Sequence, residues 1–198
     1  TTGMKFKGKM KRTFEYKSGK IKVIWNETPM EKEYEEEWIT QEIRKTTKKV
    51  LNPFSVGVEL MVHTGPRMCY GMLMAYVTPS DEQDCIKVSV AYTKENAIKY
   101  PNSLLSDDRY VYKGLSEEYV EEVCNTVSEV INEKADYWQC DIVFGDAANC
   151  EAGSSPMFFR IITKIILELI DKNELDAIST MSVADFTARY VKDINLRY

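Results

Sequence analysis

The residues best suited to nucleophilic chemistry in this sequence are its single histidine, His63, and its five cysteines. A cysteine and a histidine that are distant in sequence can meet in a fold and form a catalytic dyad, and Cys150 with His63 is one such pairing. No Gly-x-Ser-x-Gly sequence marks a serine nucleophile. The alternative for His63 is a polar side chain at the end of a strand. We therefore expect no catalytic activity.

Acidic residues form two groups that metal ions are known to favour, but neither has the spacing of a calcium loop. Asp81, Glu82 and Asp84 make one group, and Asp107 with Asp108 makes the other. Both lack the Asp-x-Asp-x-Asp-Gly pattern, so solvated loop carboxylates are the alternative. A structural zinc site needs about four ligands, and one histidine with scattered cysteines does not supply them. We expect no metal and no organic cofactor.

Two features have the chemistry to contact phosphate groups. Gly153-Ser154-Ser155-Pro156 reads as a helix start, where free backbone amides can hold a phosphate oxygen; capping of the helix by serine is the alternative. Near the N-terminus, Lys5, Lys7, Lys9 and Lys11 fall on odd positions and so on one face of a strand. That lysine face is either solvated, which protects a sheet edge against aggregation, or a phosphate contact.

Charge is distributed unevenly along the 198 residues. The chain carries −5, but residues 1–22 hold eight Lys or Arg and one acid, a net +7, so the rest carries −12. An acidic body with a basic end is not typical of a general nucleic-acid binder, although it is compatible with local RNA contact. The odd number of cysteines, without Cys-x-x-Cys, indicates reduced thiols and a cytoplasmic protein. We expect no membrane span and no signal peptide.

The groups named above would be positioned mainly by strands. Alternation of apolar and polar residues predicts strands in much of the chain. Ser18-Gly19 and Thr64–Arg67 are the predicted hairpin turns. A loop of small residues is predicted over Gly145–Gly153. The predicted strands are a first one ending at Tyr16, then Lys20–Trp25, Val56–His63, Tyr70–Val77, Cys85–Tyr92 and Asp141–Phe144.

Helical periodicity predicts two good helices, Glu117–Lys134 capped by Ser116 and Met157–Ile170 opened by the Ser-Pro pair. Acids and an apolar stripe predict a further helix over Met30–Leu51, but its β-branched residues favour a strand, and both readings stay open. Leu175–Tyr198 is predicted as a last helix. Together the elements predict a two-layer α+β fold, with a mixed, mainly antiparallel sheet and helices on one face.

Four segments share residues with one known family. In order, they resemble its motifs Val-Ile-Tyr-x-Glu-x-Pro, Asn-Pro-Phe with a Gly-x-x-Met-x-Tyr loop, Ile-Pro-x-Glu-Tyr-Ile-x-x-Val, and Ser-Thr-Pro-x-x-Phe-Arg. The segments are Val23-Ile24-Trp25-Asn26-Glu27-Thr28-Pro29, Asn52-Pro53-Phe54 with Gly65–Gly71, Leu115–Val123, and Ser154-Ser155-Pro156-Met157-Phe158-Phe159-Arg160. The set resembles domain IV of the elongation factor G family, and most of all its tetracycline ribosomal protection proteins, over about residues 21–172.

The resemblance implies the ribosomal protein S5 domain 2-like fold, a four-stranded sheet with two helices on one face. In the family, tip loops of this domain reach the decoding site of the small ribosomal subunit and touch ribosomal RNA. By position, the tip loops here are His63–Cys69 and Asn149–Gly153. Arg67 is the best candidate for a phosphate or base edge, because guanidinium binds either one bidentately. The implied RNA-binding residues are His63, Thr64, Arg67, Asn149, Glu151 and Ser154.

The chain also departs from the family. Cys150-Glu151-Ala152-Gly153 stands where protection proteins have Tyr-Ser-Pro-Val, so the aromatic and proline that act at the drug site are absent. No Gly-x-x-x-x-Gly-Lys-Ser/Thr sequence is present, so we expect no GTPase domain and either a fragment of a translation factor or a stand-alone relative. The expected organisation is a basic hairpin over 4–22, the domain IV-like part over 23–172 and a helical extension over 173–198.

The function predicted from this resemblance is a non-catalytic ribosome-binding module whose partner is the small subunit and its RNA. The acidic balance outside the first 22 residues favours an alternative, a module of the same fold that binds a protein partner or a second copy of itself. A small enzyme using His63 and a cysteine is a distant third reading.

Overall fold

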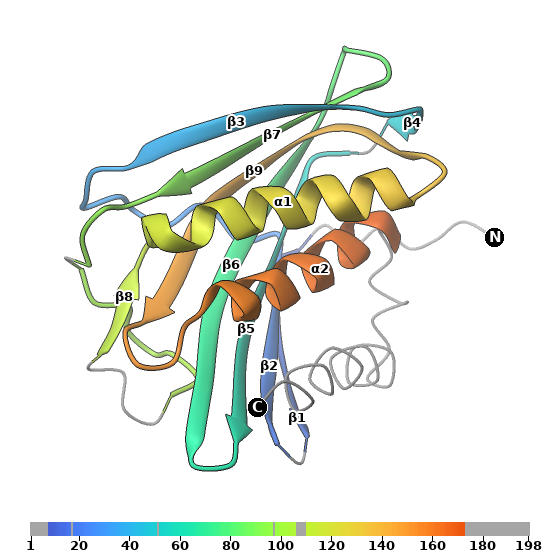
Figure 1. The fold of residues 1–198 in the computed structure, drawn as a ribbon. Helices are drawn as coiled ribbons and strands as arrows, with labels where there is room; N and C mark the ends of the chain where they lie inside the picture. The colour runs from blue at the N-terminus through green and yellow to red at the C-terminus, as the bar shows by residue number, and fades with distance from the viewer. Residues whose placement is uncertain (1–7, 17, 51, 97, 106–109, 173–198) are drawn as a thin grey trace.

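Two helices cover one face of a large, mostly antiparallel sheet in the computed structural model (Figure 1). The structure describes residues 8–172, apart from 17, 51, 97 and 106–109. The predicted α+β class with helices on one face is confirmed. The predictions for Lys5, Lys7, Asp107, Asp108 and Leu175–Tyr198 fall outside the described residues. No helix within the described part is long and apolar enough to cross a membrane.

The sheet is organised around its longest strand, which lies late in the chain. The strand order is β1-β2-β5-β6-β9-β7-β3, and β9 pairs in parallel with β7 and antiparallel with β6. The short strands β4 and β8 pair with the two ends of β9. The elements are β1 (Met10–Tyr16), β2 (Gly19–Trp25), β3 (Glu37–Arg44), β4 (Thr47–Val50), β5 (Phe54–Thr64), β6 (Arg67–Pro79), β7 (Cys85–Tyr92), β8 (Val111–Lys113), α1 (Glu117–Glu133), β9 (Tyr137–Cys150) and α2 (Pro156–Lys172).

Both faces of the central strands are buried, because successive side chains of β5 and β6 point to opposite sides of the sheet. On the helix side, Leu60 and Leu73 belong to the main core together with residues of α1 and α2. On the other side, Met61 and Met72 belong to a second cluster that the irregular segments around Met30 and 100–105 cover. The sheet is therefore sandwiched between helices and irregular chain.

The two helices contact each other as well as the sheet. The rings of Tyr119 in α1 and Phe159 in α2 are stacked, with centroids 4.9 Å apart. Arg160 of α2 pairs with Glu122 of α1 at 3.0 Å and also with Glu129. Each helix is amphipathic, so apolar packing below and ion pairs above fix their mutual position.

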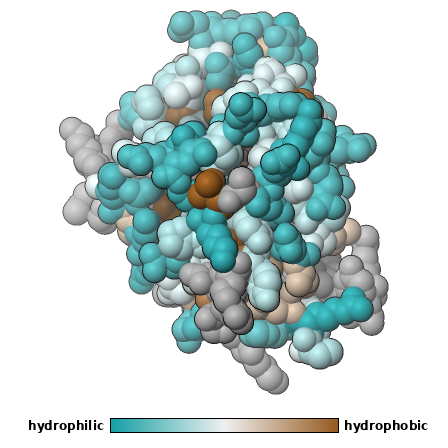
Figure 2. Space-filling view, turned by 90° about the vertical axis from the view of Figure 1, so that its left-hand side faces the viewer, coloured by the Kyte–Doolittle hydropathy of each residue, from teal (hydrophilic) through white to brown (hydrophobic). Residues whose placement is uncertain are grey.

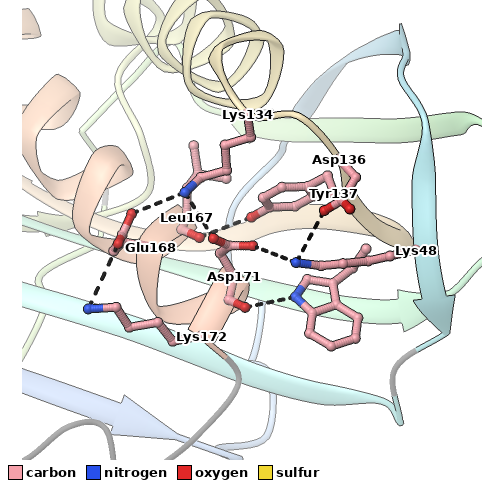
Figure 3. Close-up of polar contacts among 9 residues, drawn as sticks. Lys48, Lys134, Asp136, Tyr137, Leu167, Glu168, Asp171 and Lys172 are labelled. Atoms are coloured by element: carbon pink, nitrogen blue, oxygen red, sulfur yellow. Dashed lines mark hydrogen bonds and ion pairs between the residues drawn. The ribbon is translucent and has the colours of Figure 1, made fainter.

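A polar cluster fastens the C-terminal end of α2 to the start of β9 (Figure 3). The Tyr137 hydroxyl donates to the Leu167 carbonyl at 3.0 Å, and the Trp138 indole N–H donates to the Asp171 carbonyl at 3.0 Å. Lys134 Nζ lies 2.9 Å from the Asp171 carboxylate. The Trp138 indole thereby satisfies a carbonyl that the last turn of a helix leaves without a partner.

The predicted helix over Met30–Leu51 is wrong. The segment contains β3 and β4, and β3 pairs antiparallel with β7 along its whole length. The stripe of Met30, Tyr34 and Trp38 fits a helical period, but the neighbouring β-branched residues lose rotamer freedom in a helix and pack well on a pleated sheet. Pairing with β7 decides the outcome, as tertiary context commonly overrides weak propensity.

The predicted loop over Gly145–Gly153 is wrong for most of its length. β9 continues to Cys150, and only residues 151–153 form a turn. Ser116 stands at the predicted start of α1, although its side chain makes no capping hydrogen bond. Both predicted hairpins and the strand Cys85–Tyr92 are confirmed.

The face of the molecule in Figure 2 is mostly hydrophilic, and hydrophobic residues show only in small, separate patches. Such scattered apolar area is normal for a protein surface and gives no reason to place a broad apolar interface on this side.

Candidate nucleic-acid interface at the paired loops

The two segments that the resemblance implies as tip loops lie side by side around one cavity. The first is the turn between β5 and β6, and the second is the turn between β9 and α2. The cavity has a volume of about 560 Å³. We call it the loop cavity, and its lining consists of Thr64, Gly65, Pro66, Arg67, Met68, Cys69, Ala152, Gly153, Ser154, Ser155, Met157 and Phe158.

Backbone and hydroxyl hydrogen bonds lock the two turns together. The Tyr70 amide donates to the Gly153 carbonyl at 3.0 Å. The Ser154 hydroxyl donates to the Tyr70 carbonyl at 2.7 Å and accepts from the Cys150 amide at 2.8 Å. A Cβ at Gly153 would lie 2.9 Å from the Met68 carbonyl oxygen, so glycine permits the close approach. The second turn is thus held against β6.

The turn between β5 and β6 is tight and pre-organised. Thr64 pairs with Arg67 at the end of the ladder, so Gly65 and Pro66 are its central residues. Gly65 has φ +62°, which glycine adopts without the steric cost of a side chain. Proline fixes φ near −65° at the next position, and this combination suits a type II′ hairpin turn. The hairpin therefore presents Thr64 and Arg67 on a stiff end.

The start of α2 forms the opposite wall of the loop cavity. The Ser155 hydroxyl accepts from the Phe158 amide at 3.2 Å, and Pro156 is the first helical residue. This is the capping alternative for the serine pair. The Ser154 hydroxyl also has hydrogen-bond partners already, because it joins the second turn to β6. Neither serine therefore needs a ligand to satisfy its hydroxyl.

The lining combines one charge with hydroxyls and apolar groups. Arg67 is the one charged residue among the twelve that line the loop cavity, and its side chain is exposed. Met68 and Met157 are partly buried, and Phe158 is buried behind them. A guanidinium beside an apolar wall suits a planar or anionic group that needs both stacking surface and N–H donors.

A buried carboxylate lies on the sheet face away from the helices, where Tyr70 belongs to the second cluster. The side chain of Glu59 is fully buried and accepts from the Tyr70 hydroxyl at 2.9 Å and from the Leu104 amide at 2.7 Å. Lys22 Nζ lies 2.5 Å from its other oxygen. Burial, and then the nearby Glu59 charge, raise the pKa of Tyr70 far above that of an ordinary phenol, so its hydroxyl stays a donor. Tyr70 thus connects this network, through its own backbone, to the second turn.

The other predicted RNA-binding residues lie in different surroundings. His63 is exposed near the end of β5, and Glu151 is exposed in the second turn without lining the loop cavity. The placement of Asn149 in a loop is wrong, since it is buried in β9. Its amide donates to the Gly114 carbonyl at 2.9 Å and to Asn96 at 3.2 Å. Asn149 therefore orders the neighbouring chain and has no free side chain to offer a ligand.

The described part of the lysine face is already engaged. Lys9 and Lys11 lie 3.1 and 3.3 Å from the carboxylate of Glu27. The hydrogen bond from Lys9 lowers the pKa of that carboxyl below its usual value. Both lysines remain more than half exposed, so they keep access to solvent.

No contact in the described part of the chain supports catalysis or metal binding at the expected groups. Cys150 is buried, and the described hydrogen bonds include none between it and His63. Asp84 accepts from the Thr47 amide at 2.8 Å, and Glu82 pairs with Arg44 at 3.0 Å. No group of three His, Cys, Asp or Glu in the described ranges is arranged to hold a metal ion.

The apolar lining was not foreseen as part of a site. Met157 and Phe158 appear in the sequence as part of the apolar face of a helix, and Met68 as part of a hairpin loop. The one available signal was the Ser-Pro helix start, which places the first turn of α2 beside the preceding loop.

Comparisons with protein-family models, with curated proteins and with solved structures gave no match for this chain. The resemblance to the elongation factor G family therefore rests on the quoted motifs alone.

Proposed function

We propose that this chain is a non-catalytic module that binds RNA of the small ribosomal subunit, on a domain related to domain IV of elongation factor G. The observation that carries the proposal is the meeting of its two implied tip loops around the loop cavity at one end of the β5–β6 hairpin. These loops are about 85 residues apart in sequence, and nothing in their local pattern requires them to meet.

The mutual contact of the four family-like segments is a second line of support. The segment Val23–Pro29 begins in β2, which pairs with β5 next to Asn52-Pro53-Phe54. Tyr119 of the third segment stacks on Phe159 of the fourth. The set thus corresponds to one packed unit, as expected of residues retained from a common fold.

The topology of the central strands also supports the ribosomal protein S5 domain 2-like fold as part of the proposal. The strands β5, β6, β9 and β7 are neighbours in that order, and α1 and α2 lie on one of their faces. This arrangement supports the proposed four-stranded sheet with two helices on one face. The outer strands β1, β2 and β3 extend it at both edges.

Arg67 is the residue on which RNA contact would depend most. It stands on the exposed end of the hairpin, where a guanidinium can reach a phosphate or a base edge, and Thr64 beside it offers a hydroxyl. Because the body of the protein is acidic, contact would be confined to this end.

Co-sedimentation with isolated ribosomal subunits over a salt series tests the proposal. We expect salt-sensitive binding to the small subunit, weakened about tenfold by Arg67→Glu, and a log–log salt slope that falls by about 1 in that variant. Lys87→Glu, at an exposed lysine of β7 away from the loop cavity, is the matched charge reversal and should leave binding unchanged. Absence of binding at low salt, or equal loss in both variants, would refute the assigned site.

A further inference from the structure

The strand β3 forms an edge of the sheet that natural proteins usually protect. It has eight residues, no proline and a continuous register with β7. Among the residues that the structure describes, none pairs with its outer edge. Trp38 and Ile39 are 51% and 43% exposed, and two of the three exposed large hydrophobic residues in the described part thus lie on this strand. A long, regular edge of this kind is a template for another strand.

The register with β7 decides which backbone groups of β3 are free. The Lys45 amide donates to the Asp84 carbonyl at 3.1 Å, one step beyond the pair Arg44 with Cys85. In an antiparallel ladder, alternate residues direct both backbone groups to the same neighbour. Odd-numbered residues therefore face β7, and the N–H and C=O of Trp38, Thr40, Glu42 and Arg44 point outward.

The side chains of β3 divide between the two faces of the sheet. Gln41 donates to the Cys124 carbonyl of α1 at 3.0 Å, and Ile43 is buried in the main core, so odd-numbered side chains face the helices. Even-numbered side chains face the other way, where the Thr40 and Ser89 hydroxyls lie 3.0 Å apart. Trp38 stands on this second face.

We propose that β3 pairs antiparallel with β3 of a second copy of this chain, across a two-fold axis that passes midway between the Gln41 residues of the two copies. In an antiparallel pair, opposed residues must both direct their backbone groups toward the partner or both away. Only residue pairs of the same parity can therefore face each other. The axis at Gln41 meets this condition and aligns all four outward-pointing residues.

A second copy fits because the strand is complementary to itself in this register. Glu37 lies opposite Lys45 of the second copy, and Ile39 lies opposite Ile43. Trp38 lies opposite Arg44, whose guanidinium can stack on the exposed indole ring. Each of these pairs occurs twice by symmetry, which is the property of an isologous interface.

Neighbouring elements leave room for the pairing. With strands about 4.8 Å apart and α1 lying over β3 and β7, the two copies of α1 would be roughly 10–14 Å apart. That spacing approaches the distance at which helices pack. The pairing lies at the edge of the sheet opposite to β1. No residue of β3 lines the loop cavity.

Sedimentation equilibrium over a wide protein concentration range tests the pairing. We expect the mass to rise from that of the 22.9 kDa monomer toward twice this value. Thr40→Pro removes an outward N–H that the monomer does not use and should hold the protein at the monomer mass. Trp38→Lys should do the same, whereas Tyr110→Lys, which replaces an equally exposed aromatic outside β3, should leave the dimer intact.

A charge exchange tests the register. In Glu37→Lys, the new lysine of each copy lies opposite Lys45 of the other, so two repulsive pairs form. We expect the dimer to weaken by about two- to thirty-fold. Adding Lys45→Glu should restore it. A monomer mass at every concentration, a dimer that survives Thr40→Pro and Trp38→Lys, or no recovery in the double variant would overturn the proposal. Circular dichroism confirms that each variant is folded.

Discussion

The buried carboxylate of Glu59 offers the sharpest test of how β2, β5, β6 and the segment around Leu104 are held together. Its side chain has no solvent exposure, and three donors converge on its two oxygens. One of them, Lys22, is 18% exposed and can recover some hydration when its partner is removed. The Tyr70 hydroxyl, which is buried, and the Leu104 amide would lose their shared acceptor oxygen.

The expected loss in the free energy of unfolding follows from these three hydrogen-bond partners. Leaving a buried donor unsatisfied costs about 1–3 kcal/mol, and breaking a buried ion pair from one side costs about 3–5 kcal/mol. Because one partner reaches solvent, we expect Glu59→Ala to lower the free energy of unfolding by about 3–5 kcal/mol. Glu59→Gln keeps the shape and one acceptor oxygen, so we expect a loss of about 2–3 kcal/mol.

Urea unfolding at neutral pH, followed by circular dichroism, measures both variants. Lys22→Met completes a double-mutant cycle with Glu59→Gln and isolates the energy of the ion pair, which we expect to be about 1–3 kcal/mol. Hydrogen exchange at the Leu104 amide should accelerate in Glu59→Ala, since its bond to the carboxylate is lost. A loss below about 1 kcal/mol in Glu59→Ala would refute the reasoning, because the donors would then have other partners.

Two further predictions concern protonation and thiol reactivity. The hydrogen bond from Arg160 lowers the pKa of Glu129, so its contribution to stability is present above about pH 4.5 and is lost as the pH falls through the lowered value. Arg160→Met should therefore flatten the acid side of a stability–pH curve from urea unfolding. Burial raises the pKa of Cys140 to about 12, so a thiol reagent at neutral pH should label the partly exposed Cys69 before Cys140, as mass spectrometry would reveal. Equal labelling rates of the two thiols would contradict the buried placement of Cys140.

The parts of the fold that were predictable from sequence are those whose local signals agree with one another. The β5–β6 hairpin combines alternation with a Gly-Pro turn, and α2 combines a Ser-Pro start with a continuous apolar face. The β3 segment carries conflicting signals, acids typical of a helix start beside β-branched residues. Its partner strand lies about 45 residues away, and local pattern contains no information about that pairing.

The candidate site was predictable in position but not in composition. Family-like motifs identified both turns, and Arg67 lines the cavity between them. Asn149 was misplaced because small residues such as Ala147 and Ala148 are rare in strands, although they fit a crowded central strand. The apolar wall at Met157 depends on how α2 enters the sheet, which is a tertiary property.

The position of β9 between β6 and β7 has a consequence for how the protein acquires its structure. The strands β1, β2, β5 and β6 form one antiparallel group, β7 and β3 form another, and β9 is the strand that joins them. During synthesis, each of these two groups of strands has an unpaired edge until the ribosome has made the chain as far as residue 150. Pairings of such wide sequence separation slow folding, and open edges in the interval invite wrong partners. We therefore expect refolding in milliseconds to seconds, limited by insertion of β9.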